Sequence, residues 1–184
     1  KKSRRVASEG LVAFCVDGTR GALIELNAET DFVARNTEFQ EFASTLASLA
    51  LNADDLESLS AADYPDTGRN VADELTNKIA TIGENMSLRR MAAVSVGSGA
   101  VVSYMHNATA AGLGRIGVLV ALESTAGVDV LEGLGKQIAM HIAATAPASL
   151  SVDDLDQDMV QRERDVLIEQ AKASGKPQEI AEKM

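Results

Sequence analysis

Three glycines in the second half of the chain, Gly112, Gly114 and Gly117, match the spacing G-x-G-x-x-G that binds the pyrophosphate of a dinucleotide. This chemistry requires a loop that follows a strand and opens a helix, because amides at the helix N-terminus bind the phosphates. Here the loop precedes an apolar run at residues 118–122, which predicts a strand. We therefore favour a connection between strands, with a dinucleotide-binding enzyme that uses residues 112–117 as the alternative.

The histidines and the single cysteine do not predict a catalytic or metal site. Neither His106 nor His141 has a His, Asp or Glu at i+3 or i+4, as a helical metal motif requires. His106 should open a loop after a strand, where a polar surface role fits, whereas His141 should be buried or at the boundary of a helix. Cys15 excludes an internal disulfide and suits a reducing compartment. We expect no metal and no cofactor.

The densest polar signal is the run ELNAETDFVARN at residues 25–36, which leads from an expected strand into an expected helix. In one interpretation Thr30 or Asp31 caps a helical turn and Phe32 packs into the core. In the other, Phe32 is an exposed aromatic wedge beside the carboxylate of Asp31 and enters an apolar slot in a partner. The residues alone favour the first interpretation.

The elements that must position these residues follow from the hydrophobic pattern. A β-hairpin is expected from apolar runs on either side of a turn at residues 17–21. A helix follows, with Thr37 and Gln40 spaced as a capping box. After a surface connection, Asn70 should cap a second helix that ends at Gly83. The expected strands and the third helix cover residues 88–96, 101–105, 115–123 and 130–145.

Strands grouped between helices, rather than alternating with them, predict an α+β fold with mainly antiparallel sheet. We expect two small subdomains of sheet packed with helices, at residues 1–98 and 99–150. Residues 151–184 have a thin apolar stripe, which predicts a protruding antiparallel helical hairpin, a coiled coil cut short at its turn.

Composition narrows the function classes. The formal net charge is −10, with six aromatic residues and no Trp, so neither a nucleic-acid groove nor an aromatic platform for bases is expected. The run of basic residues near the start of the chain is too short to predict an arm that binds nucleic acid, and we interpret it as a solvated end. No run approaches a membrane span and no signal peptide is recognisable, so we expect a cytoplasmic protein.

The chain resembles the elongation factor Ts family, the guanine-nucleotide exchange factors of elongation factor Tu. The resemblance lies in four ordered blocks: NAETDFVARN at residues 27–36, KIATIGEN at 78–85 with Arg89 and Arg90, GRIGVLV at 114–120, and IAMHIAA at 138–144. The ending, SGKP and EIAEKM, is similar to the tip of the coiled-coil hairpin of that family. The family's amino-terminal helical domain and the part after the hairpin tip have no counterpart here, so the resemblance covers the central core.

The resemblance implies which residues bind the partner. Phe32 would insert between helices of the nucleotide domain of elongation factor Tu, and Asp31 would disturb the water and magnesium network that holds GDP. Ile82, Gly83 and His106 match other contact positions of the family. The family motif therefore overrules the core interpretation of Phe32.

The implied function is a translation elongation factor, not an enzyme, that binds both GDP-bound and nucleotide-free elongation factor Tu and catalyses GDP release. It would act without direct contact to nucleic acid or membrane, in a bacterial cytoplasm, with an organellar matrix as the alternative. Two rivals stay open: the dinucleotide-binding enzyme, and a structural interaction module that docks through its helical arm and uses Asp31 and Phe32 only for its own stability.

Overall fold

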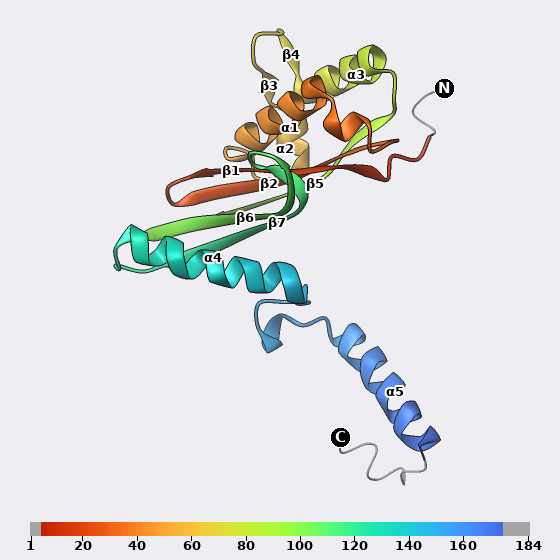
Figure 1. Ribbon diagram of the computed structural model, residues 1–184, viewed down its shortest axis with the longest axis vertical. Coiled ribbons are helices and arrows are strands. Elements are labelled where there is room, and N and C mark those ends of the chain that lie inside the picture. The colour runs from red at the N-terminus through yellow and green to blue at the C-terminus, as the bar shows by residue number, and fades with distance from the viewer. Residues whose placement is uncertain (1–4, 175–184) are drawn as a thin grey trace. The chain divides into compact units, whose positions relative to one another are not determined.

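A hairpin of two nine-residue strands, β1 (Glu9–Asp17) and β2 (Arg20–Ala28), lies at the centre of the sheet in this computed structural model, which describes residues 5–174. The other strands are β5 (Met86–Ser95), β6 (Gly99–Ala110) and β7 (Leu113–Glu123). Their order is β5-β2-β1-β7-β6, and every pairing is antiparallel (Figure 1). The expected hairpin and the three expected strands are confirmed.

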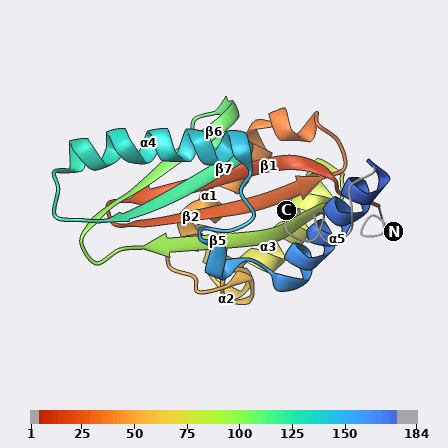
Figure 2. The same cartoon turned by 90° about the horizontal axis from the view of Figure 1, so that it is seen from below.

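Helices cover the strands on two sides (Figure 1). Helix α1 (Thr37–Ala50) packs on β1 and β2, and helix α4 (Val128–Thr145) packs on β6 and β7 (Figure 2). The core between α1 and the hairpin combines the large buried side chains of Phe39, Phe42 and Leu46 with alanines that have no exposed surface: Ala13, Ala22, Ala28, Ala43, Ala47 and Ala50. A second, smaller cluster joins α4 to β7 through Val118, Val120 and Ala139. The α+β fold with antiparallel sheet is therefore confirmed.

Glycines let β6 and β7 pack tightly against the hairpin. A Cβ on Gly117 of β7 would lie 2.7 Å from a methyl carbon of Leu23, and one on Gly21 of β2 would lie 2.6 Å from a methyl carbon of Val101. A larger residue at either position would force these neighbouring side chains to move. Gly21 and Gly117 thus allow close packing between the strands, which is a common function of glycine inside a strand.

Helix α1 begins one residue earlier than the expected capping box. The Oδ1 atom of Asn36 accepts a hydrogen bond from the backbone N–H of Phe39 at 3.2 Å, which makes Asn36 the N-cap. Thr37 is already the first helical residue, so its assignment as the cap was wrong. Asn is as good a cap as Thr, and the tertiary position of the preceding turn decides between them.

The connection between α1 and the next helix contains more structure than the sequence indicated. It holds the short helix α2 (Leu56–Ala61) and the two-stranded ladder of β3 (Asp63–Tyr64) and β4 (Arg69–Asn70). Helix α3 (Val71–Ile82) follows, and the Asn70 side chain accepts from the Asp73 N–H at 2.8 Å, as expected. Gly83 ends the helix with a left-handed backbone, φ 92°.

Contacts divide the chain into two compact units, residues 1–145 and 146–184. The second unit contains a short 3-10 turn, η3 (Val152–Asp154), and helix α5 (Gln157–Ala173). The return helix of the expected hairpin falls on residues 175–184, outside the described part of the chain, so the coiled coil stays a prediction. The subdomain boundary between residues 98 and 99 also stays a prediction. No helix within residues 5–174 is long and apolar enough to cross a bilayer.

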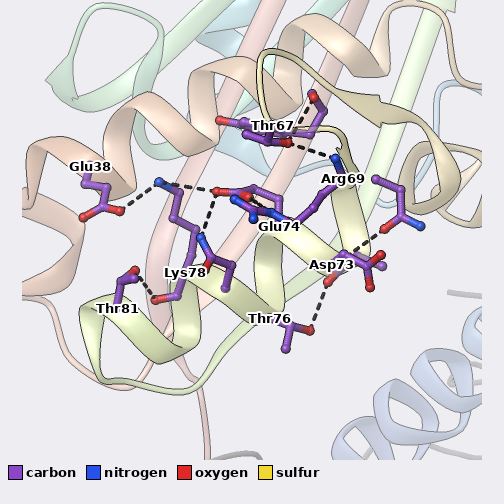
Figure 3. A network of polar contacts seen from close by, with 12 residues as sticks. Glu38, Thr67, Arg69, Asp73, Glu74, Thr76, Lys78 and Thr81 are labelled. Carbon is purple, nitrogen blue, oxygen red and sulfur yellow. Dashed lines mark hydrogen bonds and ion pairs between the residues drawn. The ribbon is translucent and has the colours of Figure 1, made fainter.

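A network of charged groups fixes α3 to its neighbours (Figure 3). The buried carboxylate of Glu74 accepts from Arg69 Nε at 2.7 Å and from Asn77 at 3.4 Å, and Lys78 Nζ lies 3.6 Å away. Lys78 also donates to Glu38 in the first turn of α1 at 2.8 Å. Helix α3 is thereby tied to β4 on one side and to α1 on the other.

The same contacts shift the ionisation of these groups. Burial alone would raise the pKa of Glu74, but the hydrogen bonds from Arg69 and Asn77 and the two neighbouring cations outweigh it, so the pKa lies below its ordinary value of 4.5. Burial likewise opposes the charge of Lys78, but Glu38 and Glu74 raise its pKa above 10.5. Both shifts favour the charged network.

We predict that Glu74 contributes to the acid sensitivity of folding. Because its folded pKa is lowered, its stabilisation is complete above pH 4.5 and is lost as the pH falls through the folded value. Glu74→Gln should lower stability at pH 7 by about 1.5–3 kcal/mol, the usual worth of hydrogen bonds to a charged group, and should flatten the loss between pH 4.5 and pH 3. Urea unfolding at these pH values measures both effects. Glu57→Gln, on the exposed side of α2, is the control, and equal pH slopes for wild type and Glu74→Gln would contradict the prediction.

Candidate partner-binding site

The segment between β2 and α1 is held by its small apolar residues and not by its aromatic ring. Val33 and Ala34 are buried, within a single 3-10 turn, η2 (Val33–Arg35). The Ala34 carbonyl accepts from the Gln40 side chain at 3.0 Å, and the Asn36 N–H donates to the Val33 carbonyl at 2.9 Å. These contacts anchor the turn on both sides.

Phe32 projects from this anchored turn. Its side chain is 76% exposed, and no side-chain hydrogen bond caps the turn that begins there. The interpretation that Thr30 or Asp31 caps a helical turn and Phe32 packs in the core is therefore wrong, because Val33 and Ala34 fill that space instead. Asp31 is half-exposed, and its carboxylate lies 3.9 Å from the Arg35 guanidinium, at the limit of an ion pair. An unusually exposed ring thus stands beside an accessible carboxylate.

Two carboxylates join this turn to the segment after α3. Glu84 accepts from the backbone N–H of Thr30 at 3.0 Å and from the Thr30 hydroxyl at 2.7 Å. In return, Glu29 accepts from the backbone N–H of Asn85 at 2.6 Å, and its carboxylate also lies 3.4 Å from the Arg5 guanidinium. We call this set, Glu29, Thr30, Glu84 and Asn85, the reciprocal clamp.

The clamp brings together two pairs of predicted contact residues. Asp31 and Phe32 directly follow Thr30, and Ile82 and Gly83 directly precede Glu84. The left-handed Gly83 donates its N–H to the Ile79 carbonyl at 3.2 Å and turns the chain out of α3. Half-buried Ile82 packs at the margin of the main core. Both pairs follow from the family resemblance, whereas the four polar residues that join them were not predicted as site residues. Their only signal in the sequence is that they lie inside two of the family blocks, residues 27–36 and 78–85.

His106 lies on a different strand but toward the same end of the sheet. One row of paired residues crosses all five strands: Ala108, Gly114, Val12, Glu25 and Arg90. From this row, His106 and the end of β2 lie in the same direction, separated by three strand spacings, about 14 Å. His106 is exposed, as expected, and its Nδ1 atom is 3.1 Å from the Tyr104 hydroxyl. The expectation that it opens a loop was wrong, because β6 continues to Ala110 and His106 pairs with Ile116 of β7. The contacts described do not join His106 to the clamp.

The two arginines of the second family block have a structural function. A β-bulge sets Arg89 and Arg90 of β5 against Glu25 of β2, and Glu25 accepts from both guanidinium groups, at 3.1 and 2.5 Å. Burial would raise the pKa of Glu25, but the hydrogen bond and charge of Arg90, helped by Arg89, lower it. The ion pairs connect the edge strand to the central hairpin a few residues before the candidate site.

The glycine motif does not form a phosphate-binding loop. Gly112 occupies the turn between β6 and β7 with φ 71°, and Gly114 and Gly117 lie within β7. A Cβ on Gly114 would lie 2.6 Å from the side chain of Met105, so this glycine too allows close strand packing. The loop opens a strand, and the helix N-terminus that the dinucleotide chemistry requires does not follow it.

His141 corrects a further expectation. It is exposed on α4 and does not lie inside or at the boundary of the core, because the buried face of the helix is formed by Leu131, Gly135 and Ala139. In this helix only small or aliphatic residues approach the sheet. The prediction relied on the apolar neighbours Ile138 and Ile142, which are indeed half-buried, but His141 itself lies on the exposed side of the helix.

Comparison with known proteins places these features in a family. The family model described as elongation factor TS matches residues 29–184, more than half of the chain. The chain belongs to the elongation factor Ts family. It is 60% identical over 186 residues to elongation factor Ts of Sphingopyxis alaskensis, 57% identical over 186 residues to that of Erythrobacter litoralis, and 56% identical over 185 residues to that of Rhodospirillum centenum. Each alignment covers all of this chain and 60% of the relative, so the chain spans about 60% of the length of these elongation factor Ts proteins.

We predict that the ring of Phe32 contributes little to folding of this elongation factor Ts core. Phe32→Ala should change the free energy of unfolding by less than about 0.5 kcal/mol, because surface side chains without packing partners rarely do more. Phe39→Ala, which empties a fully buried site in α1, should cost about 3–5 kcal/mol. Chemical denaturation of both variants tests the contrast. A large loss of stability in Phe32→Ala would instead favour the structural interpretation of this residue.

Proposed function

We propose that this chain is the part of a translation elongation factor that binds elongation factor Tu and releases its GDP. The single observation that supports it most is the 76% exposed ring of Phe32 on an anchored turn. The exposed ring contributes little apolar burial to folding, and hot spots of protein interfaces are enriched in aromatic anchors. Membership of the elongation factor Ts family supports elongation factor Tu as that partner.

In the proposed mechanism, Phe32 enters an apolar slot between helices of the nucleotide domain. Asp31, half-exposed beside it, brings a negative charge toward the magnesium and water network that holds GDP. Ile82 and Gly83 contact the partner next to this wedge, and His106 contacts it at a separate point on β6. The cation and the nucleotide belong to the partner, so this chain needs no cofactor or metal ligands of its own.

Exchange in this mechanism is driven by binding alone. A factor that binds the nucleotide-free partner more tightly than the GDP form lowers the affinity for GDP by the same ratio, as thermodynamic reciprocity requires. No bond is formed or broken by the chain, so the proposed activity is not enzymatic bond chemistry. We place it in the bacterial cytoplasm, where elongation factor Tu acts, without direct contact to nucleic acid or membrane.

The two rival functions explain fewer features. A dinucleotide-binding enzyme needs a helix after the glycine loop, where β7 is found. A purely structural role for Phe32 needs the ring in the core, where Val33 and Ala34 are found. Saturable binding of NAD would revive the first rival.

We predict that Phe32→Ala slows GDP release from elongation factor Tu. Removing an anchor from an apolar slot typically costs 2 kcal/mol or more, a loss of roughly thirtyfold in the efficiency of exchange. The measurement follows the fluorescence of labelled GDP bound to elongation factor Tu after addition of the 184-residue chain, over a range of chain concentrations. Asp31→Ala should also be weaker than wild type.

A matched control removes an exposed apolar side chain outside the site. Val130 on α4 is 65% exposed, so Val130→Ala deletes a comparable surface contact and should leave exchange within about twofold of wild type, as peripheral positions usually do. The proposal fails for Phe32 if Phe32→Ala matches this control, and for the chain if wild type does not accelerate release at any concentration.

A further inference from the structure

We propose that the reciprocal clamp is a positioning device that fixes the segment before Asp31 and Phe32 to the segment after Ile82 and Gly83, an inference that rests on the proposed function. Its four residues are not proposed to contact the partner. They would act by deciding where the contact residues stand before the partner arrives. Glu84 is the central member, because its carboxylate makes two of the three hydrogen bonds between the segments.

The clamp continues the pairing of β2 with β5 after the strands have ended. The last regular pairs are Asn27 with Ser87 and Ala28 with Met86. One step further, Glu29 bonds to the amide of Asn85, and one step beyond that, the amide of Thr30 bonds to Glu84. Side-chain carboxylates thus replace the backbone carbonyls as acceptors, while the antiparallel register is kept.

The clamp lies directly beside the proposed contact residues in the chain. Asp31 and Phe32 follow Thr30, and Ile82 and Gly83 precede Glu84. Strand pairing does not continue to these residues, because α3 ends at the left-handed Gly83 and the other segment turns into η2. The side-chain bonds of the clamp are therefore the described hydrogen bonds that join the two segments next to the site.

Carboxylates suit this function better than neutral acceptors. Hydrogen bonds to an ionised acceptor are shorter and about twice as strong as neutral ones, and two of them on one carboxylate fix its orientation. Glu84 receives both the amide and the hydroxyl of Thr30, so it holds the residue immediately before the Asp31-Phe32 pair by two points. All four clamp residues are half-buried, which shields these bonds from competition by water.

Preorganisation is the expected gain. The exposed ring of Phe32 has few contacts of its own, so its position follows the backbone on either side. Val33 and Ala34 fix the following side, and the clamp fixes the preceding side. Without the clamp, this turn would have to be ordered during association, and ordering flexible groups at an interface reduces affinity.

Amide hydrogen exchange tests the clamp without any partner. In wild type, the amides of Thr30 and Asn85 should both be protected. Glu84→Ala should increase exchange at Thr30 by at least tenfold while Asn85, bound to Glu29, keeps most of its protection. Glu84→Gln should restore protection at Thr30, since its amide oxygen can accept from the N–H and its amide group can donate to the hydroxyl. Uniformly faster exchange at both amides in Glu84→Ala, or no change at Thr30, would overturn the clamp.

The GDP-release assay tests whether the clamp positions the contact residues. Glu84→Ala should raise the concentration of the chain at half-maximal GDP release by about tenfold, which corresponds to the cost of ordering one or two side chains during binding. The maximal rate should stay within twofold of wild type. Phe32→Ala should instead lower the maximal rate. Glu84→Gln should return the half-maximal concentration toward wild type, and Glu132→Ala, which removes a carboxylate from the exposed face of α4, should match wild type.

The two assays separate the failures. If wild type does not release GDP at any concentration, the proposed function fails and amide exchange alone decides the clamp. If wild type is active, and Glu84→Ala loses amide protection at Thr30 but releases GDP with unchanged kinetics, the clamp exists and its positioning function is overturned. If Glu84→Ala and Glu84→Gln are equally impaired, the charge itself contacts the partner and the positioning interpretation is overturned.

Discussion

The antiparallel pairing of β2 with its neighbours is the constraint on which the rest of the molecule depends. The hairpin of β1 and β2 occupies the centre of the sheet, so α1 packs on it, β7 extends it on one side and β5 on the other. The end of β2 leads into the turn that carries Phe32, and the start of β5 receives the chain from Gly83. Two segments about fifty residues apart in sequence therefore meet because two strands pair.

Much of this arrangement follows from sequence patterns. The hairpin, the helix α3 between its caps Asn70 and Gly83, and the interior strand β7 all have strong local signals, namely turn residues, caps and continuous apolar runs. The α+β class follows from the grouping of strands between helices. Such features are determined by residues close together in the chain, and a single sequence is enough to indicate them.

What could not be predicted depends on competition between neighbours. Phe32 and Val33 are both apolar, and only the packing of η2 decides that the smaller one is buried and the larger one exposed. Asn36 and Thr37 are both good caps, and His141 lies one helical position from half-buried isoleucines. The bonds between Thr30 and Glu84 join residues 54 positions apart, which no local pattern indicates. The family resemblance corrected the prediction that Phe32 is buried, because the family motif carries information about exposure that the local sequence pattern lacks.

The contact between α1 and the hairpin mixes two kinds of buried residue with different tolerances. Its alanines have no side-chain torsion to be ordered on folding, so these positions gain burial at little entropic expense. The same core also holds Phe39, Phe42 and Leu46, which are fully buried. Truncating one of these large side chains would leave a cavity, whereas enlarging one of the alanines would force the helix away from the strands that lead to the exposed ring.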